Sequence, residues 1–208
     1  MNTPHRLAAP SQNFLYAVSR IEQDQGARAG VVEYMHARYQ YGTKAMRTLV
    51  VYYSRTGTTE RIARMLAAEF GADMERIRCP GCGPGGRGLL RTILIALGLV
   101  EPPISSAAYD PSAYDLVLVG TPVWAWSAAA PVRLWLRREA RNLPEYAIFA
   151  TAGGSSFRRA FAAIETLAGK PPRATLGLSA EAICSGRDHL ATLRFSEALR
   201  PAHQRLFA

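Results

Sequence analysis

Cysteine, lysine and long apolar runs are scarce in this chain of 208 residues. Its cysteines, Cys79, Cys82 and Cys184, are few and odd in number, which argues against a disulfide framework and fits a reducing compartment. The longest apolar stretch, residues 89–100, is interrupted by Arg91 and falls short of the roughly 20 residues that a membrane helix needs. We therefore expect a soluble protein without a membrane span.

The N-terminal residues 1–25 lack the apolar centre and the small-residue cleavage site of a secretory signal, so we expect a cytoplasmic location. Lysine occurs only at Lys44 and Lys170, and arginine therefore carries most of the formal net charge of +9. The arginines are spread along the chain, and no zinc-ligand spacing, aromatic RNA-binding signature or basic arm accompanies them. This pattern indicates a solvated surface and no nucleic-acid partner.

The composition, with 49% apolar and 20% charged residues, suits one compact domain with a full core. Residues 1–45 differ from the rest because they are polar and contain no strand-like run. We therefore divide the chain into an N-terminal extension of unknown role, 1–45, and a patterned domain, 46–208.

Strand and helix patterns alternate through that domain. Short β-branched and aromatic runs predict strands, amphipathic stretches predict helices, and a glycine- and proline-rich segment at 79–88 predicts a loop. The strands are predicted at 48–53, 73–77, 115–120, 146–151 and 174–179, and the helices at 58–70, 89–98, 130–140, 156–169 and 187–206. This alternation predicts an α/β fold with a doubly wound, five-stranded parallel sheet in a three-layer sandwich. Such sheets bind ligands at the carboxyl ends of their strands, near the point where strand order reverses.

The segment after the first strand gathers hydroxyl side chains around one glycine. Ser54, Thr56, Thr58 and Thr59 surround Gly57 where a helix begins. A helix N-terminus offers unpaired N–H groups and a positive dipole end, so hydroxyls there suit a phosphate, whereas simple N-capping needs one hydroxyl. We interpret the segment as a phosphate-binding loop.

Other phosphate-binding loops do not match this segment. No lysine completes G-x-x-x-x-G-K-[ST], G-x-G-x-x-G is missing from the turn, and no cysteine stands where a phosphatase needs one. A response regulator would carry acidic residues where Tyr53 and Ser54 stand.

The loops after the third and fourth predicted strands, 115–120 and 146–151, complete the predicted site. Trp124 and Trp126 follow a buried strand, where an indole either covers a flat ligand or packs on the following helix. Of the two, we expect Trp124 to stack on the ligand. Gly153 and Gly154 begin the other loop, which either approaches a ligand edge or forms a generic tight turn.

Three motifs in this order resemble the flavodoxin family: "VVYYSRTGTTE" at 50–60, "YDLVLVGTPVWA" at 114–125 and "FATAGGSS" at 149–156. The resemblance runs from Met46 to the C-terminus and implies non-covalent FMN, with its phosphate on the first loop and its isoalloxazine between the second and third. The implied cofactor-binding residues are Ser54, Arg55, Thr56, Gly57, Thr58, Thr59, Thr121, Pro122, Val123, Trp124, Ala125, Trp126, Thr151, Ala152, Gly153, Gly154 and Ser155. The chain departs from typical electron-carrier flavodoxins in being basic and in offering only Phe157 as an aromatic near the third loop.

Our leading hypothesis is an FMN-binding flavodoxin-like electron-transfer protein whose partner is a redox protein or a small-molecule electron acceptor. The alternatives are an FMN-dependent NAD(P)H or quinone reductase and a flavin-free interaction domain on the same fold. We assign no catalytic side chain and no metal ligand, because all four histidines lie outside the three loops. The spacing of Cys79 and Cys82 is that of a redox dithiol, and this possibility stays open.

Overall fold

The computed structural model describes residues 46–80, 82, 90, 93–95, 100, 103–105, 108–154 and 156–200. The chain divides into two compact units, Met1–Ala45 and Met46–Ala208, and all described residues belong to the second. The predicted N-terminal extension therefore lies outside the described residues. So do most of the predicted helix at 89–98 and the end of the predicted helix at 187–206.

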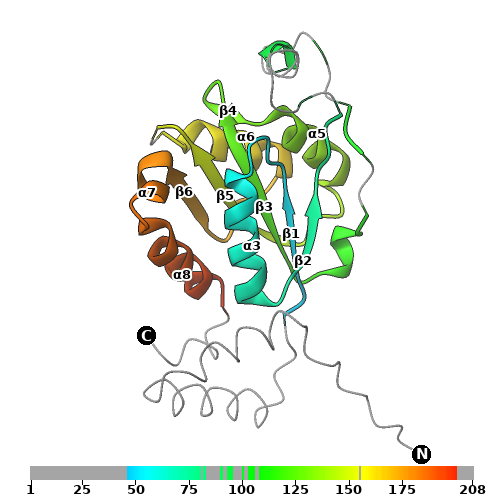
Figure 1. The fold of residues 1–208 in the computed structure, drawn as a ribbon. Helices are drawn as coiled ribbons and strands as arrows, with labels where there is room; N and C mark the ends of the chain where they lie inside the picture. Colours follow the sequence, from blue (N-terminus) through cyan, green and yellow to red (C-terminus); the bar gives the residue numbers. More distant parts are fainter. Residues whose placement is uncertain are drawn as a thin grey trace, which may run out of the picture. The chain divides into compact units, whose positions relative to one another are not determined.

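Strands and helices alternate along the described domain (Figure 1). In chain order the elements are β1 (Thr48–Tyr52), α3 (Thr58–Phe70), β2 (Asp73–Arg76), η1 (Pro111–Ala113), β3 (Leu116–Trp124), β4 (Ser127–Ala128), α5 (Ala130–Glu139), β5 (Glu145–Ala152), α6 (Arg158–Ala168), β6 (Thr175–Ser179), α7 (Ala180–Cys184) and α8 (Arg187–Leu199).

Five of the strands form a parallel sheet in the order β2-β1-β3-β5-β6. The order runs one way from β1 to β2 and the other way from β1 to β3, as in a doubly wound sheet. The predicted fold class is thus confirmed. One addition was not predicted: β4 pairs antiparallel with the end of β3, with Trp124 opposite Ser127.

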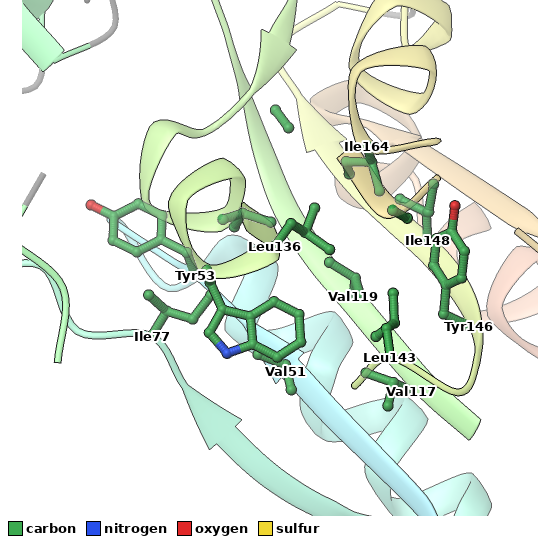
Figure 2. Packing of buried hydrophobic residues seen from close by; sticks show 14 of the residues in the cluster. Val51, Tyr53, Ile77, Val117, Val119, Leu136, Leu143, Tyr146, Ile148 and Ile164 are labelled. Atoms are coloured by element: carbon green, nitrogen blue, oxygen red, sulfur yellow. The ribbon is translucent and has the colours of Figure 1, made fainter. Parts of the chain in front are cut away.

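Alternate residues of the buried strands point to opposite faces of the sheet and pack into two separate hydrophobic cores. On one face, Val50 and Tyr52 pack with residues of α3 and α8. On the other face, Leu49 and Val51 pack with residues of α5 and α6. Figure 2 shows the second core, with Tyr53 and Tyr146 at opposite ends of the cluster. The three layers follow from this period-two alternation.

The helix ends have local causes. α3 stops at Gly71, whose φ of 59° lies in the left-handed region and whose N–H donates to the carbonyl of Ala67. α8 begins at Arg187, where the last helix was predicted to begin. The short α7 was not predicted, and Gly186, with a φ of 73°, separates it from α8. Among the residues that the structure describes, no helix combines the length and apolar character that a bilayer crossing requires.

Candidate functional site

Three loops meet at the carboxyl edge of the sheet. They lie at the carboxyl ends of β1, β3 and β5, which are neighbours in the sheet, and strand order reverses between β1 and β3. We call them the first loop (Ser54–Thr59), the second loop (Thr121–Ser127) and the third loop (Thr151–Ser156), although each includes the end of a regular element. The third strand was predicted to end at residue 120, but β3 continues to Trp124. All carry predicted site residues, and Ser155 lies outside the described residues.

The hydroxyls of the first loop do not cap α3. Gly57 is the N-cap residue, with a φ of 93° and no side-chain hydrogen bond to the helix amides. An ideal Cβ at Gly57 would have no atom within 4 Å, so the backbone here faces open space. Only the left-handed φ requires glycine. The helix therefore presents amides without a side-chain cap at an open position.

The hydroxyl side chains of this loop fall into two pairs. Ser54 and Thr59 are buried: the Ser54 hydroxyl accepts the Gly57 N–H at 3.1 Å, and Thr59 shares a hydrogen bond of 2.8 Å with Thr151. Thr56 and Thr58 are exposed, and neither hydroxyl bonds to any part of the chain that the structure describes. The buried pair shapes the loop, and the exposed pair is free for a ligand.

Arg76, the last residue of β2, supports the first loop from the side. Its guanidinium donates to the Ser54 carbonyl at 3.1 Å and contacts the Glu60 carboxylate at 3.1 Å. Glu60 also accepts a hydrogen bond from Arg64 at 2.8 Å, which is the main reason that its pKa lies below its ordinary value. A carboxylate beside a phosphate site would repel the ligand, and the two arginines offset its charge.

The sequence analysis did not identify Arg76. In the sheet it lies opposite Tyr52, two residues before the first loop begins. Knowing the register of β1 against β2 would have placed Arg76 beside the first loop, but the pattern of residues within one strand does not give that register.

The second loop divides its aromatic residues between the core and the solvent. Trp124 is half-buried, packs against the core of Figure 2 and meets Tyr53 edge to face, with ring centroids 5.3 Å apart. Trp126 is 65% exposed. The two side chains thus differ in accessibility, and Trp126 has the indole that is open to a ligand.

Backbone geometry produces this division. Ala125 and Trp126 both have positive φ, 46° and 62°, and form the turn between β3 and β4. Two-residue hairpin turns of this kind usually use glycine or asparagine, so a tryptophan there is strained. Strain of this sort is concentrated at functional sites.

The other predicted residues of the second loop lie closer to the sheet. Thr121 is buried; its hydroxyl donates to the Pro122 carbonyl at 2.8 Å and accepts the Ala129 N–H at 2.9 Å. Its hydroxyl is therefore occupied in joining β3 to α5. Pro122 and Val123 are half-buried at the end of β3.

The third loop is small and open. Thr151 is buried and bonded to the first loop, Ala152 is half-buried, and Gly153 and Gly154 are exposed with no atom near an ideal Cβ. Phe157 lies over Gly177 of β6 and stacks on Phe161 at 6.0 Å. The aromatic ring nearest this loop therefore belongs to the packing of α6.

Cys79 and Cys82 form a disulfide, and Cys184 is free and exposed. The low cysteine content argued against a framework of several disulfides. A single bridge between residues three apart is not such a framework. Within the described residues no group of three or more His, Cys, Asp or Glu side chains could hold a metal ion.

Comparisons with known proteins bear on the fold of this chain. A scan against family models and a search of curated proteins find no match. A flavoprotein from Lactobacillus acidophilus, crystallised in complex with FMN, is 22% identical with a TM-score of 0.57; the match covers 68% of this chain and 98% of that one. A Bacteroides eggerthii protein, provisionally assigned as a flavoprotein, is 25% identical with a TM-score of 0.56 over 70% and 98% of the two chains.

A Trp repressor binding protein from Bacillus subtilis is also similar, at 16% identity and a TM-score of 0.50 over 74% of this chain and 100% of that one. The parallel sheet and its strand order agree with the fold of these neighbours. The chain has the flavodoxin-like fold, and its resemblance to the flavodoxin family is confirmed at the level of the fold.

Proposed function

We propose that this protein binds FMN without a covalent bond and transfers electrons through it. The observation that carries the proposal is the first loop, where helix amides without a side-chain cap and two exposed threonine hydroxyls surround an open glycine. That donor set fits a phosphate group. The Lactobacillus acidophilus neighbour, which was crystallised with FMN, supports the same cofactor.

In this proposal the first loop holds the phosphate. Thr56, Thr58 and the amides of α3 donate hydrogen bonds, and the positive end of the helix dipole attracts the anion. Arg55 is half-buried and makes no ion pair with any described residue, so its charge is available to the same group. Ser54, Thr59 and Arg76 keep the loop in position.

The second and third loops hold the flavin ring. The exposed indole of Trp126 offers a flat apolar surface, and Trp124 supports the turn through its contact with Tyr53. Ala152, Gly153 and Gly154 let the ring edge approach the backbone. The bound cofactor supplies the redox chemistry; the chain's own residues bind it, orient it and tune it through stacking and charge. No side chain is needed as a general base.

A second candidate, an FMN-dependent NAD(P)H or quinone reductase, is favoured by the openness of the third loop. Its exposed glycines and the inward position of Phe157 leave space where an aromatic side chain would cover the flavin. Mixing FMN-loaded protein with NADPH anaerobically separates the two functions. Rapid loss of flavin absorbance with NADPH alone indicates a reductase, and no loss indicates an electron carrier.

The net charge of +9 indicates the kind of redox partner. A basic protein attracts acidic surfaces and repels basic ones at low salt, so we propose an acidic redox protein or a small-molecule acceptor, in the cytoplasm. The rate of electron transfer from an acidic reductase should fall as ionic strength rises and the charges are screened. A rate that rises with salt contradicts this partner.

The test of the proposed function compares FMN with riboflavin, which lacks the phosphate. Purified protein should show flavin absorbance bands, or gain them when FMN is added, and calorimetry should show much tighter binding of FMN than of riboflavin. Equal affinities for FMN and riboflavin would contradict the assignment of the first loop as the phosphate-binding loop. A colourless protein that binds neither ligand would favour the flavin-free interaction domain.

A further inference from the structure

The Cys79–Cys82 bridge is a chemically reactive feature that the proposed function does not use. The Cys82 N–H donates to the Cys79 carbonyl at 3.0 Å, which closes a tight turn around the disulfide. Cys79 is half-buried, whereas Cys82 is only 2% exposed. The two cysteines therefore differ in exposure, and Cys79 is the more exposed of the pair.

The bridge lies against residues that support the second loop. Cys82 packs with Ile95 and with Ala130, the first residue of α5. The hydroxyl of Tyr53 donates to the Cys82 carbonyl at 3.4 Å, and burial raises the pKa of Tyr53, so this hydroxyl stays protonated. Cys79 packs against the core that includes Tyr53, and Trp124 packs against the same core. The bridge and Trp124 therefore share Tyr53 as a common contact.

A purely structural role explains this disulfide poorly. A bridge across so few residues closes a very short loop, and the entropic stabilisation from a disulfide is smallest for short loops. The sequence composition also indicates a reducing compartment, where disulfides are usually transient and act in catalysis or redox sensing. A zinc site is incomplete as well, since the described residues place no further ligands beside the two sulfurs.

We propose that Cys79 and Cys82 form a thiol–disulfide exchange site whose substrate class is a dithiol reductant, and that the reductant attacks Cys79. The incoming thiolate bonds to the Cys79 sulfur, the S–S bond breaks, and Cys82 leaves as a thiolate that takes up a proton. The second thiol of the reductant, once deprotonated, then attacks the mixed disulfide and releases Cys79, which is also protonated. The reductant loses two electrons and two protons, and the cysteine pair gains them.

This inference does not rest on FMN binding, because it depends only on the chain's own sulfurs and their neighbours. It can therefore be tested on the full chain without cofactor. Failure of the exchange site would leave the FMN proposal intact, and the reverse also holds.

The experiment uses the Cys184→Ser variant, which removes the one free and exposed cysteine among the described residues. Native protein is equilibrated with mixtures of reduced and oxidised dithiothreitol, and the released thiols are counted with a thiol reagent. We expect no reactive thiol in the oxidised protein, two after reduction, and full reversal on reoxidation. Thiols that appear only after urea is added, or that do not reoxidise, would overturn the proposal.

Two single variants test the direction of attack. In the Cys184→Ser background, Cys82→Ser leaves only the half-buried Cys79 thiol and Cys79→Ser leaves only the buried Cys82 thiol. We expect oxidised glutathione to form a mixed disulfide with Cys79 on the order of tenfold faster than with Cys82, because reactivity follows access. Equal rates, or a faster reaction at Cys82, would contradict entry at Cys79. If either variant does not fold, trapping the mixed disulfide in the Cys184→Ser protein and mapping it by mass spectrometry answers the same question.

A separate measurement tests whether reduction of the Cys79–Cys82 bridge alters the second loop. Reduction should change tryptophan fluorescence in the Cys184→Ser protein, since Tyr53 joins Cys82 to Trp124. The matched control adds Trp124→Phe, which should abolish the change, whereas Trp126→Phe should keep it. An unchanged spectrum on reduction would show that the bridge is not linked to the loop.

Discussion

The first and second loops follow neighbouring strands of one sheet, yet different forces fix them. Hydrogen bonds shape the first loop, through the Ser54 hydroxyl, the Thr59–Thr151 pair and the Arg76 guanidinium. In the second loop, aromatic packing of Trp124 on Tyr53 and the core is added to the hydrogen bonds of the Thr121 hydroxyl and of the β3–β4 pair. The second loop also contains strained backbone, and the described part of the first contains left-handed backbone only at its glycine.

The difference corresponds to the two parts of the proposed ligand. A phosphate needs donors aimed at one point, which a hydrogen-bonded loop around a helix N-terminus provides. A flavin ring needs a flat apolar surface, which an indole held away from the core provides. If this interpretation is right, substitutions in the first loop should affect phosphate recognition, and substitutions in the second should affect ring recognition.

The largest effect is expected from Thr56→Ala combined with Thr58→Ala. Each hydroxyl that bonds a charged phosphate is worth about 1.5–3 kcal/mol, so FMN affinity should fall steeply while riboflavin affinity changes little. Titration calorimetry with both ligands measures the contrast. Because both side chains are exposed, the melting temperature should stay near that of the parent protein.

The matched control for this pair is Thr59→Ala. Its hydroxyl bonds Thr151 inside the protein, so the substitution should lower stability as well as affinity for FMN. Parallel losses of FMN and riboflavin affinity in the Thr56–Thr58 double variant would mean that the exposed hydroxyls do not recognise phosphate.

The next largest effect is expected from Gly120→Ala, at the base of the second loop. A Cβ there would come as close as 2.2 Å to the ring of Phe149, which is fully buried. Overpacking of this kind costs about 1–3 kcal/mol of the free energy of unfolding. Urea denaturation measures the loss. Gly153→Ala is the control, because its Cβ would meet open space, and stability there should be unchanged.

A smaller effect separates the two tryptophans. Trp126→Ala should cost about 0.5–1.5 kcal/mol of FMN affinity through lost stacking and should remove most of the quenching of indole fluorescence. Trp124→Ala should mainly lower stability, since its side chain packs against the core. Fluorescence titration of both variants with FMN gives the answer. Quenching that persists in Trp126→Ala and vanishes in Trp124→Ala would assign the stacking to Trp124.

The sequence predicted the fold because its signals are local. The runs that became β1 and β3 are apolar and β-branched, and α3 has an amphipathic pattern that ends at Gly71. The hydroxyl cluster of the first loop is also contiguous, so its position at the switch point could be predicted. What each of its hydroxyls does could not be predicted, since the partner of Thr59 lies 92 residues away.

The features that were missed depend on backbone geometry or on register between strands. β4 exists because Ala125 and Trp126 adopt positive φ, which neither residue type favours. The same turn decides which indole is exposed. Arg76 supports the first loop only because β1 and β2 pair in one particular register. Such relations become visible only when the strands are placed side by side.

The smallest effect tests whether charge contributes to the first loop. The pKa of Glu60 is lowered by its hydrogen bond to Arg64 and by the charge of Arg76, so the carboxylate is stabilised in the folded protein. A group with a lowered folded pKa contributes stability above its unfolded pKa, about 4.3 for glutamate, and loses that contribution as pH falls through the folded value. The arginine side chains of both ion pairs are about half exposed or more, so the contribution of Glu60 to the free energy of unfolding should be about 0.3–0.5 kcal/mol.

Urea denaturation of the parent protein and of Glu60→Gln between pH 6 and pH 3 measures this contribution. The difference between the two proteins should shrink as the pH falls below the unfolded pKa, and FMN affinity in the variant should change far less than in the Thr56–Thr58 double variant. A stability difference that does not change with pH would show that Glu60 acts through packing, and that hydrogen bonds, without this ion pair, are sufficient to shape the first loop.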